Sequence, residues 1–186
     1  TGYALARYKI KFKNLIISFI LMTIVIPVFT TIIPIYSFFM EHSMLDSMLW
    51  TSVIFISAFI PLNIWIIMNY FRELPEDLWE AAAIEGANER QLFFQIGLPL
   101  SKPIVLTSSL VIFLMSWKQY IIPMLLLSSH NNKVLTLIMS EFMTRDAINY
   151  SVIAMSGIIV IIPPLLASII FRKNLVSGLT AGSVKE

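Results

Sequence analysis

Four long runs without a charged side chain constrain the fold of this 186-residue chain more than any other feature. The runs lie between Lys13 and Glu41, between Asp46 and Arg72, from Lys102 to Lys118 with apolar character continuing to Leu127, and between Asp146 and Arg172. A helix rises about 1.5 Å per residue, so each run is long enough to cross a hydrocarbon core about 30 Å thick. Because a backbone that faces lipid must satisfy its own hydrogen bonds, the runs predict helices. The predicted fold class is all-α, a polytopic transmembrane helix bundle.

The whole chain, residues 1–186, is predicted to form a single transmembrane domain. We expect spans at about residues 15–40, 47–71, 103–127 and 148–171, a loop at 72–102, an outer loop at 128–147 and a tail at 172–186. The sequence begins at Thr1 and carries no signal peptide, so we expect it to be the C-terminal part of a longer chain.

The composition excludes several classes of protein. Only 13% of the residues are charged and 58% are hydrophobic, which is typical of a membrane protein and not of a soluble domain. A net charge of +2 without a basic stripe argues against nucleic-acid binding. There is no cysteine for a disulfide or a thiolate metal ligand, and His42 and His130 are too few for a histidine zinc site. We therefore predict no metal site.

Lysine and arginine are distributed unevenly between the two sides of the predicted bundle. Ten of the thirteen lie before the first span, in the 72–102 loop or after the last span. Lys133 and Arg145 lie on the other side, and Lys118 lies within a span. By the positive-inside rule, both ends of this chain and the 72–102 loop face the cytoplasm.

Prolines occur in every predicted span, at Pro27, Pro34, Pro61, Pro123 and Pro163–Pro164. Each removes a backbone donor and tends to kink its helix. This is either the ordinary tolerance of membrane helices for proline or the pattern of broken helices that line a cavity.

The 72–102 loop contains the charged, small-residue stretch EAAAIEGANERQLFFQIGLPL. Pro75 suits the first position of a helix, and Glu76 and Asp77 suit the positive end of its dipole. Three- and four-residue spacing places five residues near one face of this predicted helix: Leu74, Leu78, Ala81, Ala82 and Glu85.

Gly86 allows a turn after this helix. A second short helix, with Leu92, Phe93 and Ile96 on its apolar side, is predicted to end at Pro99. The whole is a helix–turn–helix that either packs against its own bundle or docks a soluble partner.

The stretch resembles the EAA loop of ABC-importer permeases, whose pattern is EAA, three residues, G, nine residues, I, one residue and LP. The matching positions are Glu80, Ala81, Ala82, Gly86, Ile96, Leu98 and Pro99. YALARYKIKFKN, IPVFTTIIPIY and GLTAGSVKE resemble the lead-in, the paired-proline helix and the tail of the carbohydrate-importer branch, in particular its maltose-type second permease. Members normally have six spans, so the resemblance implies that these four are the third to sixth.

In that family the EAA loop forms a coupling helix seated in a groove of the ATP-binding subunit. The resemblance implies that Glu80 makes a polar contact with the ATPase and that Ala81 and Ala82 fit the groove. Glu85 stands where the family often has aspartate, so the charge is kept. The resemblance also implies an ATPase-contacting tail, for which a loose polar terminus is the other interpretation; its residues are Gly178, Leu179, Thr180, Ala181 and Gly182.

The chain shows no catalytic constellation of its own. Its six glycines lack the spacing of a phosphate-binding loop, and no serine, histidine and acid cluster is evident. We therefore expect that it is not an enzyme and binds no cofactor, and that ATP is used by a partner subunit. The resemblance implies a second permease, ATP-binding subunits, an extracytoplasmic solute-binding protein and membrane lipid as partners, with the chain in the plasma membrane of a prokaryote.

SWKQYIIP is the most polar part of any predicted span. Its residues Trp117, Lys118, Gln119 and Tyr120 are the candidate solute pathway. An ionisable residue within a span is costly and therefore suggests function. The other interpretation is that Lys118 reaches the headgroups and that Trp117 and Tyr120 are interface anchors. Related sugar permeases usually have asparagine and an acidic residue where this chain has Lys118 and Gln119, which weakens any transfer of solute contact.

The outer loop contains VLTLIMSEFM, in which Leu135, Ile138, Met139, Phe142 and Met143 share a helical face. A short helix on the outer surface is predicted, and contact with a solute-binding protein is the second interpretation. Taken together, these patterns predict the permease subunit of an ABC importer that forms half of a pathway for a sugar or oligosaccharide. A permease for a non-sugar solute and a membrane scaffold that binds a non-ATPase partner are the competing hypotheses.

Overall fold

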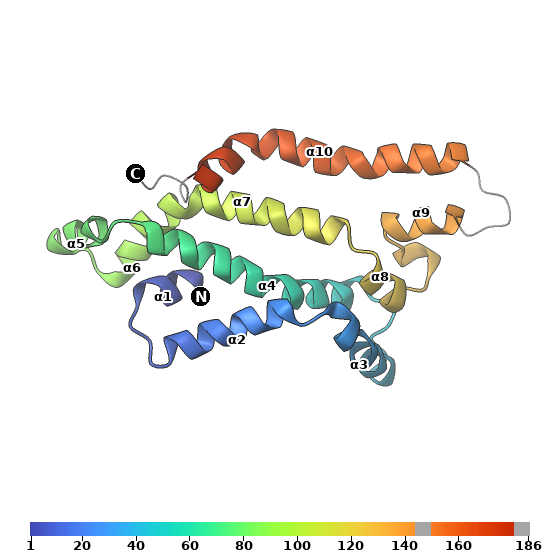
Figure 1. Cartoon of the computed structure of the whole chain (residues 1–186), viewed down its shortest axis with the longest axis horizontal. Coiled ribbons are helices and arrows are strands. Elements are labelled where there is room, and N and C mark those ends of the chain that lie inside the picture. The colour runs from blue at the N-terminus through green and yellow to red at the C-terminus, as the bar shows by residue number, and fades with distance from the viewer. Residues whose placement is uncertain (144–149, 181–186) are drawn as a thin grey trace. The chain divides into compact units, whose positions relative to one another are not determined.

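The computed structural model describes residues 1–143 and 150–180, and every regular element among them is a helix (Figure 1). The elements are α1 Gly2–Arg7, α2 Lys13–Val25, α3 Val28–Glu41, α4 Met48–Glu73, α5 Glu76–Ile84, α6 Glu89–Gln91, the π-helix η1 Leu92–Gly97, α7 Leu98–Trp117, α8 Ile121–Leu126, the 3-10 helix η2 His130–Asn132, α9 Leu135–Met143 and α10 Tyr150–Thr180. The prediction of an all-α transmembrane bundle is confirmed.

Three helical segments in the described residues are each long and apolar enough to cross a membrane: Met48–Glu73, Glu89–Trp117 and Tyr150–Arg172. A fourth crossing arises if α2 and α3 together count as one broken span. The first expected span, 15–40, is thus not a continuous helix. Pro27 explains the interruption, because it has an extended ψ of 136° and serves as the N-cap of α3.

The third apolar run is also divided. Its helix ends at Trp117 and not near residue 127, and α8 begins at Ile121. Pro123 lies in the first turn of α8, where a missing N–H is tolerated, and it therefore starts a new helix. Pro123 also leaves the backbone oxygen of Gln119 without a helical donor, and the Thr136 hydroxyl donates to that oxygen at 2.9 Å.

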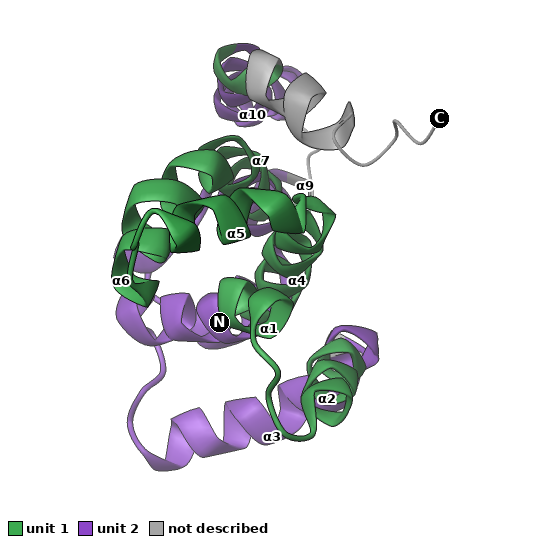
Figure 2. Cartoon of the chain, turned by 90° about the vertical axis from the view of Figure 1, so that its left-hand side faces the viewer, with its two compact units in different colours: residues 1–23, 60–112, 170–186 green, residues 24–59, 113–169 purple. Residues whose placement is uncertain are grey.

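The chain divides into two compact units, coloured separately in Figure 2. Unit 1 comprises Thr1–Thr23, Ile60–Ile112 and Ile170–Glu186. Its buried core is formed by Tyr3, Phe71, Trp79 and Leu92, which come from α1, α4, α5 and η1. The core of unit 1 is therefore built around the 72–102 loop.

Unit 2 comprises Ile24–Phe59 and Phe113–Ile169. Its buried core is formed by Ile32, Phe39, Ile122 and Leu126, from α3 and α8. A polar clip joins the turn before α4 to the segment after α8: Asp46 Oδ1 accepts from the backbone N–H groups of Ser128 and Ser129, at 3.0 and 2.9 Å. Asn132 Nδ2 in turn donates to the backbone oxygen of Asp46 at 2.7 Å.

The long apolar helices expose much of their surface. None of the residues in the most apolar window of Tyr150–Arg172 is buried, and α2 has no buried residue. Large exposed apolar side chains suit helices that face lipid or another membrane subunit, since neither environment requires them to turn inward.

Candidate functional site

The candidate site is the helix–turn–helix of the 72–102 loop, and its first helix is α5. Pro75 precedes the first turn as the N-cap, with φ of −57° and ψ of 136°, one position earlier than predicted. Glu76 and Asp77 occupy the first turn, where carboxylates stabilise the positive end of the helix dipole. The nine-residue helix ends at Ile84.

The buried face of α5 includes Leu78 and Ala82 from the face that the spacing groups together, with Leu74 just before the helix, and it adds Trp79. It is centred on Trp79, which is 3% exposed, with Leu78 and Ala82 packed beside it. Ala81 and Glu85, which the spacing places near the same face as Leu78 and Ala82, are exposed. The reason is that Trp79 offers more apolar area than any alanine, so its burial rotates the helix toward the unit 1 core.

The exposed end of α5 forms a narrow knob, which comprises Glu80, Ala81, Ala83, Ile84 and Gly86. Ile84 is 86% exposed. Burying this apolar side chain would lower the free energy of the protein in water. The knob is slim because its remaining side chains are mostly alanine and glycine. Such a surface can enter a groove on another protein.

Gly86 closes the helix with a φ of +88°, in the region that glycine adopts most easily. Its N–H bonds to the Ala83 oxygen at 3.0 Å, and the Ala87 N–H bonds to the Ala82 oxygen at 3.0 Å. This is the hydrogen-bond pattern of a Schellman C-cap, and it satisfies carbonyls that the helix end would otherwise leave free.

The second helix of the loop begins with a capping box at Asn88. The Gln91 N–H bonds to the Asn88 side chain at 3.0 Å, and the Gln91 side chain accepts from the Asn88 N–H at 2.8 Å. Ile96 packs against the unit 1 core, as does Ala82, whereas Leu98 and Pro99 are exposed. The structure therefore gathers Ala82 and Ile96 at the core and leaves Glu80, Ala81 and Gly86 on the knob.

The prediction that this helix ends at Pro99 is wrong. Pro99 is the second residue of α7, which follows directly from the π-helix η1. At the junction the Leu98 N–H bonds to the Phe93 oxygen, five residues back. The wider π-turn changes the hydrogen-bond register just before the proline, so the missing N–H does not terminate the helix.

Sequence reasoning missed the support that the 72–102 loop receives from α1. Tyr3 is 8% exposed, and its ring lies 5.0 Å from Phe71, 5.8 Å from Trp79 and 5.0 Å from Phe93, measured between centroids. The Arg7 guanidinium lies 4.8 Å above the Trp79 ring. The sequence identified the YALAR segment only as resembling a cytoplasmic lead-in, because no spacing rule pairs positions so far apart in sequence.

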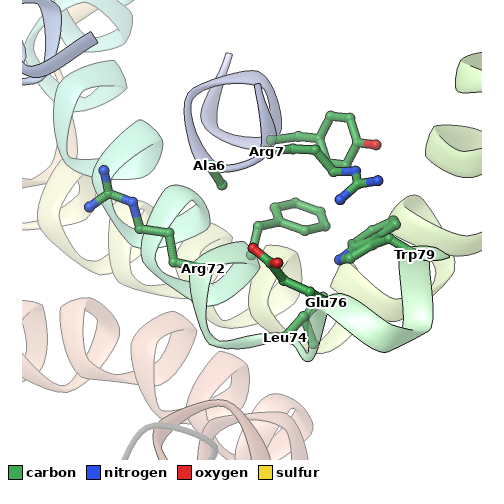
Figure 3. Close-up of a pocket in the computed structure, with 8 residues that line it drawn as sticks. Ala6, Arg7, Arg72, Leu74, Glu76 and Trp79 are labelled. Atoms are coloured by element: carbon green, nitrogen blue, oxygen red, sulfur yellow. The ribbon is translucent and has the colours of Figure 1, made fainter. Parts of the chain in front are cut away.

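A small cavity of about 170 Å³ lies beside this stack (Figure 3). Figure 3 shows Arg7 reaching over Trp79, with Arg72 on the opposite side of the cavity and the carboxylate of Glu76 between them. The Tyr3 hydroxyl and Arg7 Nε are buried without a hydrogen-bond partner in this structure.

The candidate solute residues lie at the end of α7 and in the break before α8. Trp117 Nε1 donates to the Val160 oxygen at 3.0 Å, so this polar atom is already paired. Trp117 and Lys118 line an open cavity of about 400 Å³ together with Pro164 and Ser168. Gln119 contributes its backbone oxygen to Thr136, and Tyr120 is 37% exposed. The structure thus brings Trp117 and Lys118 together at one cavity, and Gln119 and Tyr120 are not among its lining residues.

Comparison with known families assigns the chain to one of them. Residues 1–180 match the family described as "Binding-protein-dependent transport system inner membrane component". The chain belongs to this family. Its members are permease components, so the helix–turn–helix described above is that of an inner-membrane permease.

Curated relatives of this permease chain are named for sugars. The chain is 28% identical to the arabinooligosaccharides transport system permease protein AraQ of Halalkalibacterium halodurans, over 99% of this chain and 65% of the relative. It is 27% identical to the melibiose/raffinose/stachyose import permease protein MelC of Bacillus subtilis, over 99% of this chain and 67% of the relative. The chain thus spans about two thirds of the length of these relatives.

The fold of the permease chain is also found in a solved structure. A chain in the crystal structure of a bacterial ABC transporter involved in the import of the acidic polysaccharide alginate matches it with a TM-score of 0.69 and 22% identity. The match covers 92% of this chain and 65% of the other. At this level of identity the likeness establishes the shared helical fold.

The remaining predicted residues of the permease chain lie elsewhere. Gly178, Leu179 and Thr180 are the last residues of α10, and Ala181 and Gly182 lie outside the described residues. The predicted outer segment is a helix, α9, which spans Leu135–Met143.

Proposed function

We propose that this chain is part of the membrane-spanning permease subunit of an ABC importer, where it forms half of the solute pathway and couples that pathway to ATP hydrolysis by a separate subunit. The observation that carries the proposal is the exposed knob of α5. The knob ends in the Gly86 turn, and the opposite face of α5 is fixed by Trp79 in the aromatic core of unit 1.

A coupling element needs a surface that binds the partner subunit and a rigid base that holds this surface in one orientation. The surface is supplied by Glu80, Ala81 and Ile84, all exposed. The base is supplied by Trp79, because a large ring packed among other rings holds the helix in one orientation. A groove that receives the knob can therefore move the unit 1 core as a whole instead of bending α5 alone.

The proposed partners follow from the family and from the charge distribution. They are a second permease in the same prokaryotic plasma membrane, ATP-binding subunits on its cytoplasmic side and an extracytoplasmic solute-binding protein. The excess of lysine and arginine at the ends of the chain and in the 72–102 loop supports placing these segments in the cytoplasm, where the ATPase would meet the knob. We propose that this chain itself binds no cofactor.

We propose a sugar or oligosaccharide as the solute. Support comes from the sugar names of the relatives and from the cavity that contains Trp117, whose ring would suit the apolar face of a sugar. Lys118 in the same cavity supplies a donor for a hydroxyl oxygen.

The proposal is tested by affinity purification of the full-length parent protein in mild detergent, with mass spectrometry of what accompanies it. An ATP-binding subunit is expected with the wild type and should be lost from Glu80→Lys, which reverses a charge on the knob without touching the core. Glu41→Lys is the matched control, since Glu41 is exposed at the end of α3 and outside the knob. If no ATPase accompanies the wild type under conditions that preserve membrane complexes, the importer assignment fails and a scaffold role replaces it.

A further inference from the structure

We propose that α1 and the turn that follows it are a second arm of the coupling device, carrying the movement of the 72–102 loop to the start of α2. This inference rests on the proposed function and concerns residues outside the EAA pattern. Three sets of contacts within unit 1 support it.

The first set fixes α1 to α5. Arg7 lies 4.8 Å over the Trp79 ring, and Tyr3 packs edge-on against the same ring at 5.8 Å. A helix of six residues is not stable in water by itself, so the position of α1 is determined by the surfaces it packs on. When α5 moves, these contacts draw α1 with it.

The second set fixes α1 to the other half of the loop. The Tyr8 hydroxyl, just after α1, donates to Glu89 Oε2 at 2.5 Å, and Glu89 is the first residue of α6. A short bond to a carboxylate is stronger than one between neutral groups. The bond also raises the pKa of Tyr8, because the bonded hydroxyl holds its proton more tightly beside Glu89. Thus α1 and its end contact both helices on either side of the Gly86 turn.

The third set connects α1 to α2. Lys13, the first residue of α2, donates through Nζ to the backbone oxygens of Ala6 and Tyr8, at 3.1 and 3.4 Å. A cation beside the carboxyl end of a helix is favoured by its dipole. The short connection contains Phe12 at φ +60°, an uncommon conformation for a side chain of that size, which the contacts on either side must maintain.

The contacts form a continuous path from α5 and α6 through α1 to Lys13. The 72–102 loop follows α4 in sequence, so its covalent connections lead to α4 and α7. The path through α1 adds α2, although Lys13 at the start of α2 and Glu76 at the start of α5 are far apart along the chain (76 − 13 = 63 residues). Movement of the loop would therefore reach three long helices that begin or end in unit 1, namely α2, α4 and α7.

Spin labels on α2 and α5 in the complete transporter test this path, because the chain contains no cysteine that would compete for the label. The labels are placed at Asn14→Cys and Asp77→Cys, both exposed positions, with cysteines removed from the other subunits. In the wild type the distance between the labels is expected to stay the same on going from the nucleotide-free to the ATP–vanadate-trapped state. Tyr8→Phe and Glu89→Gln, which keep the size of each side chain, should shift or broaden this distance on trapping.

The two substitutions act on one bond, so the double variant should show no larger effect than either single variant. Tyr36→Phe is the matched control, because Tyr36 and Tyr8 are both 36% exposed and Tyr36 lies in α3 of unit 2. A wild-type distance that already changes on trapping would overturn the inference. So would a constant distance in both single variants.

The proposed function is tested by two separate measurements, the co-purification of the ATPase and the vanadate trapping of its nucleotide. If both are normal while the label distances contradict the path, only the inference about α1 fails. If the ATPase is absent from the wild type, the proposed function fails first.

Discussion

The indole Nε1 of Trp117 donates to the backbone oxygen of Val160 at 3.0 Å, and Val160 is the residue whose carbonyl Pro164 leaves without a helical donor. In an α-helix the N–H of residue 164 would bond to the oxygen of residue 160, but proline has no N–H. Trp117 at the end of α7 therefore supplies a donor for the α10 carbonyl that Pro164 leaves free. The indole has a structural role in unit 2 that its sequence position did not indicate.

The Trp117–Val160 bond gives the first prediction. Trp117→Phe keeps an aromatic ring but leaves the Val160 oxygen unpaired in an apolar setting, and we expect a loss of about 1 kcal/mol of stability. The same substitution should cost less in a Pro164→Ala background, where residue 164 regains an N–H for that oxygen. Thermal unfolding of the purified complex measures both differences. Equal losses in the two backgrounds would show that the bond to Val160 is not the reason.

Helices, spans and the Gly86 turn could be predicted because each depends on local sequence. Long uncharged runs predict spans, and the EAA spacing places a turn at Gly86, where the structure has φ of +88°. The interruptions at Pro27 and after Trp117 were harder to place, since a proline is compatible with a kink, a cap or a new helix start. Pro99 shows the same ambiguity, because η1 lets the helix continue past it.

Pairings between distant residues could not be predicted. The burial of Trp79 depends on Tyr3 and Phe71, and the Tyr8–Glu89 bond joins positions 81 residues apart. Periodicity reports which residues share a face and not which face finds a partner. For α5 the spacing groups Ala81 with Leu78 and Ala82, whereas the packing of Trp79 brings only Leu78 and Ala82 of these three to the core.

The Gly86 turn gives the second prediction. Steric space is not the constraint at this position, because a Cβ added there would meet nothing within 4 Å; the constraint is the φ of +88°. Gly86→Ala should therefore cost about 1 kcal/mol in the turn, Gly86→Asn less, and the β-branched Gly86→Val more. Amounts of ATPase co-purified with the full-length protein should follow the order Gly, Asn, Ala, Val. An order that followed side-chain volume alone, with Asn below Ala, would point to a steric role instead.

The third prediction concerns the clip at Asp46. Hydrogen bonds from Ser129, followed by Ser128 and Asn132, hold the pKa of this carboxyl below its usual value of 3.8. A lowered pKa in the folded state means that the clip contributes stability above the unfolded pKa and loses it as the pH falls through the folded pKa. The clip should therefore stay unchanged between pH 8 and pH 5 and weaken only in the acid range below about pH 4.

Hydrogen exchange at the amides of Ser128 and Ser129 reports on the clip directly. Protection should fall in strong acid in the wild type. Asp46→Asn keeps an acceptor oxygen but no titrating group, so its protection should be weaker at neutral pH and independent of pH in the acid range, after correction for intrinsic exchange. A wild-type transition near neutral pH would assign the titration to another group.

The final prediction concerns the close approach of α1 to α4. A Cβ added at Gly2 would lie 2.9 Å from Ile67 Cγ2 and 3.1 Å from the Ile64 backbone oxygen. The second contact is with backbone that cannot rotate away, so Gly2→Ala must displace α1 from α4. We expect a loss of about 1–3 kcal/mol in unit 1, visible as a lower unfolding temperature of the complex.

Gly157→Ala is the control for this substitution. Gly157 lies within α10, and a Cβ there would meet nothing within 4 Å, so alanine should be neutral or stabilising by up to about 1 kcal/mol through its better helix propensity. Gly2→Ala is therefore expected to lower the stability, and Gly157→Ala is not. Because α1 also holds Tyr3 and Arg7 against Trp79, Gly2→Ala should in addition loosen α5 and reduce the amount of ATPase retained. Lower stability with full ATPase retention would show that the knob keeps its position without α1.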